Sequence, residues 1–303
     1  MPTSDHKHSL SIRGTHTRLE DLIALNQWVW HIRPDVRMHR AAGTQLSLLK
    51  GRGIDFEEVR AYQPGDDIAS IDWRVTARTG KVHTKVFREE KQRSAMICLD
   101  QSSSMYFGSK DCFKSVYAAY LAAALAWTLH RHGDNVGGLI FGDQEQLQMQ
   151  CRGGRQNILR LLAAIHQLNQ SIHPDQHKPD TVNTMLQQLS QIAGHSLLLY
   201  IISDFADFDD RSLVYLRYLA KKNCITLFCI YDPLEAALPA DTELCFSNGT
   251  ERQSLYTDSA VQNTYAKLWQ QRHQYIAQHT RSFGINTFYV QKSDQIRSCL
   301  NFC

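Results

Sequence analysis

The sequence lacks a hydrophobic run long enough to cross a membrane. Its longest uncharged stretch, Ser115 to Leu129, has 15 residues, whereas a bilayer helix needs roughly 20. The first ten residues are polar and contain no apolar segment of the kind that a secretory signal carries. We therefore expect a cytoplasmic protein with no membrane span.

The chain also lacks a strong excess of charge of one sign. Its formal net charge is +3, with a net of +4 over residues 1–94 and −1 over residues 95–303. Acidic residues interleave the basic ones throughout the first segment, so no continuous basic surface is indicated. This pattern argues against a nucleic-acid partner.

Spacings typical of metal-binding or redox cysteines are missing. The chain has eight cysteines but no C-x-x-C and no paired spacing of the zinc-ribbon kind. Cys98, Cys224 and Cys229 lie inside apolar runs, where a reduced thiol behaves as a small hydrophobic side chain. We expect free thiols in a reducing compartment; a redox role at Cys299 and Cys303 is the alternative.

Three regions follow one another along the chain. A polar tail and a helical pattern over residues 18–32 occupy 1–40. Short strand-like groups separated by Gly and Pro turns occupy 41–93, which predicts a small β-rich unit. From residue 94 onward, short apolar runs alternate with helical patterns, so we assign 94–303 to an α/β domain.

The alternation after residue 94 specifies the fold class. Strands are predicted at 95–99, 136–141, 197–202, 225–230 and 285–290, with a further edge strand at 147–149. Helices are predicted at 111–130, 156–168, 182–192, 211–222 and 259–280, and from 294. Apolar strands separated by helices are typical of a doubly wound, mostly parallel sheet with helices on both faces.

Polar side chains follow two of these strands directly. Asp100, Ser102 and Ser104 come after the first strand, and Asp204 follows the most apolar one. Ligands of such sheets bind at the carboxyl ends of the strands, and carboxylate and hydroxyl oxygens suit Mg²⁺. No His or Cys is near in sequence, which argues against zinc or iron. The plainer alternative is a helix-capping Asp beside ordinary loop hydroxyls.

At these residues the sequence resembles known families. Asp100-x-Ser102-x-Ser104 on a strand–helix turn looks like the metal-ion-dependent adhesion site of von Willebrand factor A domains. The stretch from Gly53 to Gly80 is similar to the signature of the bacterial domain-of-unknown-function 58 family. Members of that family are commonly encoded beside MoxR-type AAA+ ATPases. Three later segments fit the same pattern, at 133–137, 202–205 and 232–235.

The resemblance implies a binding site rather than a reaction. In that fold the bound Mg²⁺, for which Mn²⁺ can substitute, completes its coordination with an Asp or Glu of a protein partner. A Thr from another loop supplies a third ligand, for which Thr184 is preferred over Thr181. The implied function is that of a metal-dependent adaptor or co-chaperone acting with a MoxR-type ATPase, not an enzyme.

The upstream signature has its own chemistry. Gln63-Pro64-Gly65-Asp66 indicates a tight turn. We expect Trp73 to be a buried indole, flanked by Asp72 and surrounded by ion pairs with Arg60 and Arg78. This set either fastens the small unit to the α/β domain or forms a partner surface; the residues of that surface are Arg60, Asp66, Asp72, Trp73 and Arg78.

Two alternatives to the adaptor remain open. An Asp after the first strand, with Mg²⁺ and a second Asp, is also how aspartyl-phosphate enzymes are arranged, so Asp100 is the candidate nucleophile of a phosphoryl-transfer or hydrolytic enzyme. Against this, position 102 is Ser rather than a second Asp, and the chain has no Walker A, G-x-G-x-x-G or G-x-S-x-G sequence. The other alternative is a scaffold that binds no metal.

Overall fold

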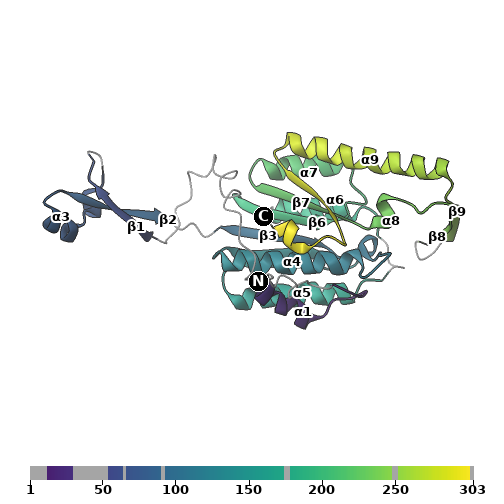
Figure 1. The fold of residues 1–303 in the computed structure, drawn as a ribbon, viewed down its shortest axis with the longest axis horizontal. Helices are drawn as coiled ribbons and strands as arrows, with labels where there is room; N and C mark the ends of the chain where they lie inside the picture. Colours follow the sequence, from purple (N-terminus) through teal and green to yellow (C-terminus); the bar gives the residue numbers. More distant parts are fainter. Residues whose placement is uncertain are drawn as a thin grey trace, which may run out of the picture. The chain divides into compact units, whose positions relative to one another are not determined.

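The computed structural model describes residues 12–29, 54–63, 66–89, 93–173, 178–247 and 252–300. The chain divides into two compact units (Figure 1), of which the smaller spans residues 45–92 and the larger comprises residues 1–44 and 93–303. Gly51 and Gly53, predicted to lie in turns, and Pro64 and Gly65 of the predicted tight turn lie outside the described residues.

The small unit is a hairpin with helical segments in its connection. Strands β1 (Ile54–Ala61) and β2 (His83–Glu89) pair antiparallel, with a bulge between Phe56 and Glu58. The connection carries a 3-10 turn, η1 (Ile68–Ser70), and a helix, α3 (Trp73–Thr79). Asp72 caps α3 by accepting from the backbone N–H groups of Arg74 and Val75, at 3.0 and 3.1 Å. The small unit therefore contains the expected β-strands, but the connection between them is partly helical.

The larger unit is built on a six-stranded sheet with the order β10-β7-β6-β3-β4-β5. All neighbouring pairs are parallel except β4 and β5, so the sheet is mostly parallel with an antiparallel edge strand. This confirms the predicted mixed α/β class. The strands are β3 (Ser94–Asp100), β4 (Asn135–Phe141), β5 (Gln146–Arg152), β6 (Leu197–Ser203), β7 (Cys224–Tyr231) and β10 (Asn286–Gln291).

The strand order reverses at β3. The chain proceeds from β3 outward to β4 and β5, and then returns to place β6 on the other side of β3. Such a reversal opens a crevice at the carboxyl ends of the two flanking strands, because the connections leave in opposite directions. Asp100 ends β3 and Asp204 directly follows β6, so the topology brings both to this crevice.

Helices cover both faces of the sheet (Figure 1). Alternate residues of β3 belong to different cores: Ala95, Ile97 and Leu99 lie in one hydrophobic cluster, Met96 and Cys98 in the other. This two-residue period with burial on both sides is expected of a covered parallel strand. The covering helices are α1 (Leu19–Val29), α4 (Lys114–Arg131), α5 (Arg155–Gln170) and α10 (Ile296–Leu300) on one face, and α6 (Thr181–Ile192), α7 (Asp210–Ala220) and α9 (Ser259–Ser282) on the other.

Residues 12–29 belong to the α/β unit, whereas residues 1–40 were predicted to be a region of their own. Leu22 and Leu25 of α1 are buried in the same cluster as α4. The indole N–H of Trp127 donates to the carbonyl of Leu22 at 3.0 Å, and Arg131 donates to the carbonyl of Val29 at 3.1 Å. Since α1 covers apolar surface of α4, it forms part of this core.

Two local predictions need correction. Helix α4 begins at Lys114 rather than at Asp111, because Asp111 has a left-handed φ of 55° and Cys112 forms a bridge with Gly14. The segment between the strand predicted at 225–230 and the helix predicted at 259–280, for which no element was predicted, contains a short helix, α8 (Pro233–Ala236), and a hairpin of β8 (Glu243–Ser247) and β9 (Arg252–Tyr256). Every residue of β9 is exposed, so this strand has no buried face that an apolar alternation in the sequence would reveal.

The described cysteines are free thiols. Cys98 and Cys229 are buried in the core, as predicted, and burial raises the pKa of each thiol well above its usual value. Cys224 is exposed instead, because it is the first residue of β7. Cys299 is buried, and Cys303 lies outside the described residues.

Among the helices that the structure describes, none combines the length and apolar character needed to span a bilayer.

The contact between α1 and α4 generates a stability prediction. Replacing the fully buried Leu22 with Ala is expected to lower the free energy of unfolding by about 2–5 kcal/mol, because it leaves a cavity against α4. Urea unfolding followed by circular dichroism measures this, with the exposed Gln27→Ala in the same helix as the control. Equal stabilities of the two variants would contradict the packing described for α1.

Candidate functional site

Asp100 is held at the end of β3 by two hydrogen bonds. The hydroxyl of Ser203, the last residue of β6, donates to Asp100 Oδ2 at 2.6 Å. The backbone N–H of Ser102 donates to Asp100 Oδ1 at 2.9 Å. Asp100 is only 1% exposed, so its carboxyl group is fixed between the two central strands and shielded from water.

Three further oxygens lie beside Asp100. Ser102 and Ser104 flank the start of the 3-10 turn η2 (Ser103–Met105), and their Oγ atoms are 3.1 Å apart. Ser104 Oγ also donates to Asp204 Oδ1 at 3.3 Å. The turn is held by Asp143, which accepts from the backbone N–H of Ser103 at 2.6 Å. The structure thus brings together Asp100, Ser102, Ser104 and Asp204, as the sequence predicted.

A buried lysine occupies one side of this group. The Nζ atom of Lys114, at the start of α4, lies 2.8 Å from Asp204 Oδ2 and 2.6 Å from Glu235 Oε1. Its side chain is 2% exposed. A buried ammonium group is costly unless it is paired and hydrogen-bonded, and here two carboxylates meet that requirement.

The two aspartates have opposite electrostatic characters. Burial, and next the negative charge of Asp204, raise the pKa of Asp100 to about 7. Burial alone would also raise the pKa of Asp204, but the charge and hydrogen bond of Lys114 lower it below its usual value. Likewise, burial would lower the pKa of Lys114, but Asp204 and Glu235 raise it. Asp204 is therefore a charged carboxylate whose charge is balanced by Lys114. The charged form of Asp100 is disfavoured, because no positive group in the described part of the chain balances it to the same degree.

The spacing of the oxygens fits a small, hard cation. Adjacent ligands of an octahedral Mg²⁺ lie about 3.0 Å apart when each bond is about 2.1 Å. The 3.1 Å between the Ser102 and Ser104 hydroxyls and the 3.3 Å between Ser104 and Asp204 match this spacing. Within the described ranges, no three His, Cys, Asp or Glu side chains gather as a metal site, so a cation here would depend on the serine hydroxyls.

The two threonines considered as a third ligand lie in the first turn of α6. The hydroxyl of Thr184 donates to the carbonyl of Asp180 at 2.9 Å, and that of Thr181 donates to the carbonyl of Lys178 at 2.8 Å. Lys178 reaches the serine turn, because its backbone N–H donates to Asp143 at 3.1 Å. The loop before α6 is thus tied to the site, while the choice between Thr184 and Thr181 stays a prediction.

The edge of the site carries an exposed arginine. Arg272, from α9, donates to the carbonyl of Phe205, the residue after Asp204. Phe205 is buried and has a left-handed φ of 53°, which a non-glycine residue seldom adopts. Its N–H donates to Ser203 Oγ at 2.9 Å. The Arg272 charge also helps to lower the pKa of Asp204, so this side chain adds positive potential next to the site.

The upstream residues do not form the buried cluster that was predicted. Trp73, the first residue of α3 after the Asp72 cap, is 67% exposed. Arg60 pairs with Asp66 at 2.6 Å rather than with groups around Trp73. Asp66 also accepts from the N–H of Gln63 at 2.9 Å, and this bond and Arg60 lower its pKa. Arg78 lies in the last turn of α3 and is exposed.

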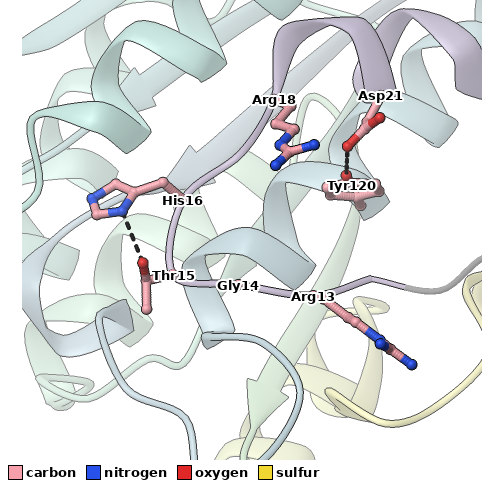
Figure 2. A pocket seen from close by; sticks show the side chains of 7 residues that line it. All are labelled: Arg13, Gly14, Thr15, His16, Arg18, Asp21 and Tyr120. Atoms are coloured by element: carbon pink, nitrogen blue, oxygen red, sulfur yellow. Dashed lines mark hydrogen bonds between the residues drawn. The ribbon is translucent and has the colours of Figure 1, made fainter.

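A separate surface hollow of about 460 Å³ lies between the segment before α1 and the start of α4. Figure 2 shows that Arg13 and Arg18 point in different directions, so their charges do not converge on one spot. Asp21 accepts a hydrogen bond from Tyr120 at 3.0 Å and adds a negative charge to the wall (Figure 2). The candidate metal ligands are not among the residues that line this hollow.

Comparison with protein families identifies the family to which the chain belongs. The family model described as "Protein of unknown function DUF58" matches residues 58–275, which include most of the small unit's signature and the whole candidate site. The chain belongs to the DUF58 family. Mb1516 of Mycobacterium bovis, an uncharacterized protein, is 27% identical over 230 residues, covering 74% of this DUF58 chain and 70% of its own. YeaD of Bacillus subtilis, also uncharacterized, is 28% identical over 110 residues, or 36% of this chain and 26% of its own.

Solved structures that are similar to this DUF58 protein are more distant. An aerotolerance-related membrane protein from Bacteroides fragilis is 14% identical, with a TM-score of 0.42. The conserved hypothetical protein BatB from Bacteroides thetaiotaomicron is 13% identical, with a TM-score of 0.41. Each comparison covers 69% of this chain and 96% of the other.

Sequence reasoning missed Lys114, Ser203 and Glu235. A single charge directly before the uncharged run that begins at Ser115 was a usable signal for Lys114, since a lysine at the start of a buried helix needs a partner. Ser203 and Glu235 stand within segments quoted for the family resemblance, but nothing in the sequence shows that they contact Asp100 and Lys114.

The raised pKa of Asp100 has a consequence for stability. Because folding raises this pKa from 3.8 to about 7, the group favours the folded state most at low pH, and the contribution is lost as the pH rises through about 7. Without divalent metal, Asp100→Asn is therefore expected to gain stability relative to the unmodified protein between pH 5 and pH 8, on the order of 1 kcal/mol or more.

Urea unfolding in EDTA at pH 5 and pH 8 measures this difference. Asp258→Asn is the control, because Asp258 is an exposed helix cap and Asn caps equally well. A relative stability of Asp100→Asn that is the same at both pH values would contradict the electrostatic description of the site.

Proposed function

We propose that this protein is a metal-dependent protein-interaction module. Its α/β unit is von Willebrand factor A-like, and Mg²⁺ or Mn²⁺ binds to Ser102 and Ser104, with Asp100, Asp204 and Thr184 completing the set of ligands or holding coordinated water. The metal's remaining position receives an Asp or Glu side chain of a protein partner. The observation that carries the proposal is the close approach of the Ser102, Ser104 and Asp204 oxygens, 3.1 and 3.3 Å apart, at the switch point of the sheet.

The charge balance supports an acidic ligand. Neutral hydroxyls leave a bound cation electrophilic, and Asp204 is already compensated by Lys114. Arg272 adds a second positive group at the edge of the site. A carboxylate arriving from outside would therefore meet a positive potential. The family resemblance suggests a MoxR-type AAA+ ATPase as the partner class, in which case the protein acts as its adaptor or co-chaperone.

The burial of Asp100 disfavours the enzymatic alternative. A carboxylate nucleophile needs an exposed oxygen, but Asp100 is 1% exposed and each of its oxygens accepts a hydrogen bond. Its raised pKa also reduces its charged fraction at neutral pH. Magnesium-dependent hydrolysis of a phosphomonoester that disappears in Asp100→Asn would instead favour the enzyme.

Metal binding is the first test of the proposal. We expect isothermal titration with Mn²⁺ to give a saturable signal that the double variant Ser102→Ala/Ser104→Ala weakens at least about tenfold, because two ligands are lost. Ser103→Ala is the matched control, since Ser103 lies between the two serines in the turn but is not a proposed ligand, and its hydroxyl donates to Asp143 at 3.4 Å. Identical titrations for the unmodified protein and the double variant would refute the site.

Partner capture is the second test. Protein captured from a native lysate in Mg²⁺, but not in EDTA or by the double variant, identifies the metal-dependent partner. For that partner, Arg272→Ala is expected to weaken binding about three- to tenfold, because a cation at the edge of the interface is lost. Arg281→Ala, also exposed on α9, is the control. Equal capture in all conditions would move attention to Arg60, Asp66, Asp72, Trp73 and Arg78.

A further inference from the structure

Lys114 is an unusual neighbour for a metal site, because it already supplies a positive charge there. It donates to Asp204 Oδ2 at 2.8 Å and to Glu235 Oε1 at 2.6 Å, and its side chain is 2% exposed. It also lies 5.8 Å from the centre of the Phe107 ring, whose face attracts a cation. The ammonium group is thus enclosed by acceptors and an aromatic ring.

Its position is fixed by a second buried ion pair. The other oxygen of Glu235, Oε2, accepts from the backbone N–H of Asp232 at 2.8 Å. Asp232 is fully buried and pairs with Lys292 at 2.9 Å. Glu235 is thus held at both oxygens, by Lys114 at one and by the cap of α8 at the other, and it fixes one side of the ammonium group while Asp204 contacts another.

This arrangement divides Asp204 between two roles. Its Oδ1 faces the Ser104 hydroxyl, while its Oδ2 is occupied by Lys114. Without metal, Lys114 neutralises the aspartate and so removes much of the cost of leaving the site empty. With metal, the same ammonium group repels the incoming cation, since the two positive charges would share one carboxylate.

We propose that Lys114 is a built-in counter-ion that keeps divalent-metal affinity low until a partner carboxylate adds negative charge. Metal occupancy then depends on the partner, and by linkage the partner's affinity depends on the metal to the same degree. The proposal rests on the metal-dependent function above and specifies its regulation. Lys114 acts as a positioning residue, since it touches Asp204 and not the partner.

Two variants that change the charge in opposite directions test the counter-ion role of Lys114. In Mn²⁺ titration of the full chain without partner, Lys114→Met is expected to raise the affinity about tenfold or more, because a nearby positive charge is removed. Glu235→Gln is expected to lower the affinity, because it removes a negative charge and leaves Lys114 to Asp204 alone. A purely structural role would shift both variants in the same direction.

Lys292→Met is the matched control, because Lys292 is also buried and ion-paired but contacts Asp232 instead of Asp204. If it raises the affinity as much as Lys114→Met, or if Lys114→Met leaves the affinity unchanged or lower, the inference is overturned. Should Lys114→Met fail to fold, Glu235→Gln is the remaining variant, since the Glu235 side chain is 31% exposed and the amide oxygen can still accept one of the two hydrogen bonds.

The two proposals fail in different ways. If the unmodified protein binds Mn²⁺ and Lys114→Met does not bind it more tightly, the counter-ion role of Lys114 is wrong but the metal site is supported. Binding by Lys114→Met alone supports the counter-ion directly. If neither the unmodified protein nor any variant binds Mn²⁺, both the metal-dependent function and the counter-ion role of Lys114 are wrong.

Discussion

A buried carboxyl group, that of Asp100, meets a largely buried one, that of Asp204, where β3 and β6 end, and their mutual repulsion is the constraint on which the rest of the site depends. Asp100 lies in the crevice because β3 is the strand at which the sheet order reverses, and Asp204 follows its neighbour β6. Burial makes two charges there costly. Hydroxyls, a backbone N–H and the Lys114 ammonium group offset this cost, but within the described ranges no ion pair to Asp100 itself is found.

The charges that surround the site also tie the sheet's carboxyl edge together. Lys114 begins α4 and contacts the residue after β6, while Glu235 and Asp232 follow β7. Lys292, directly after β10, pairs with Asp232, whose side chain also accepts from Ser109 in the loop after η2. Segments from four strand ends are therefore joined by buried ion pairs and hydrogen bonds. Such a framework keeps a binding site in place before any ligand arrives.

The small unit presents a different kind of surface. Asp72 organises α3 by capping it, and Arg60 and Asp66 stabilise the preceding turn. Ile68 and Trp73 are 69% and 67% exposed, which is unusual for side chains of this size. Some signature residues of this unit thus stabilise its own turn and helix, whereas others form an exposed apolar surface. The larger unit carries the candidate metal site, so the family signature combines two regions with separate chemistry.

The sequence by itself determined the alternation of strands and helices after residue 94, because apolar periodicity follows directly from burial on a sheet or a helix face. It also located Asp100, Ser102, Ser104 and Asp204, since residues after parallel strands share one edge. Tertiary structure decided the partners of Lys114, which lie 90 and 121 positions away along the chain, and left Trp73 67% exposed rather than buried. Contacts between residues so distant in sequence leave no local pattern, because only the folded chain brings them together.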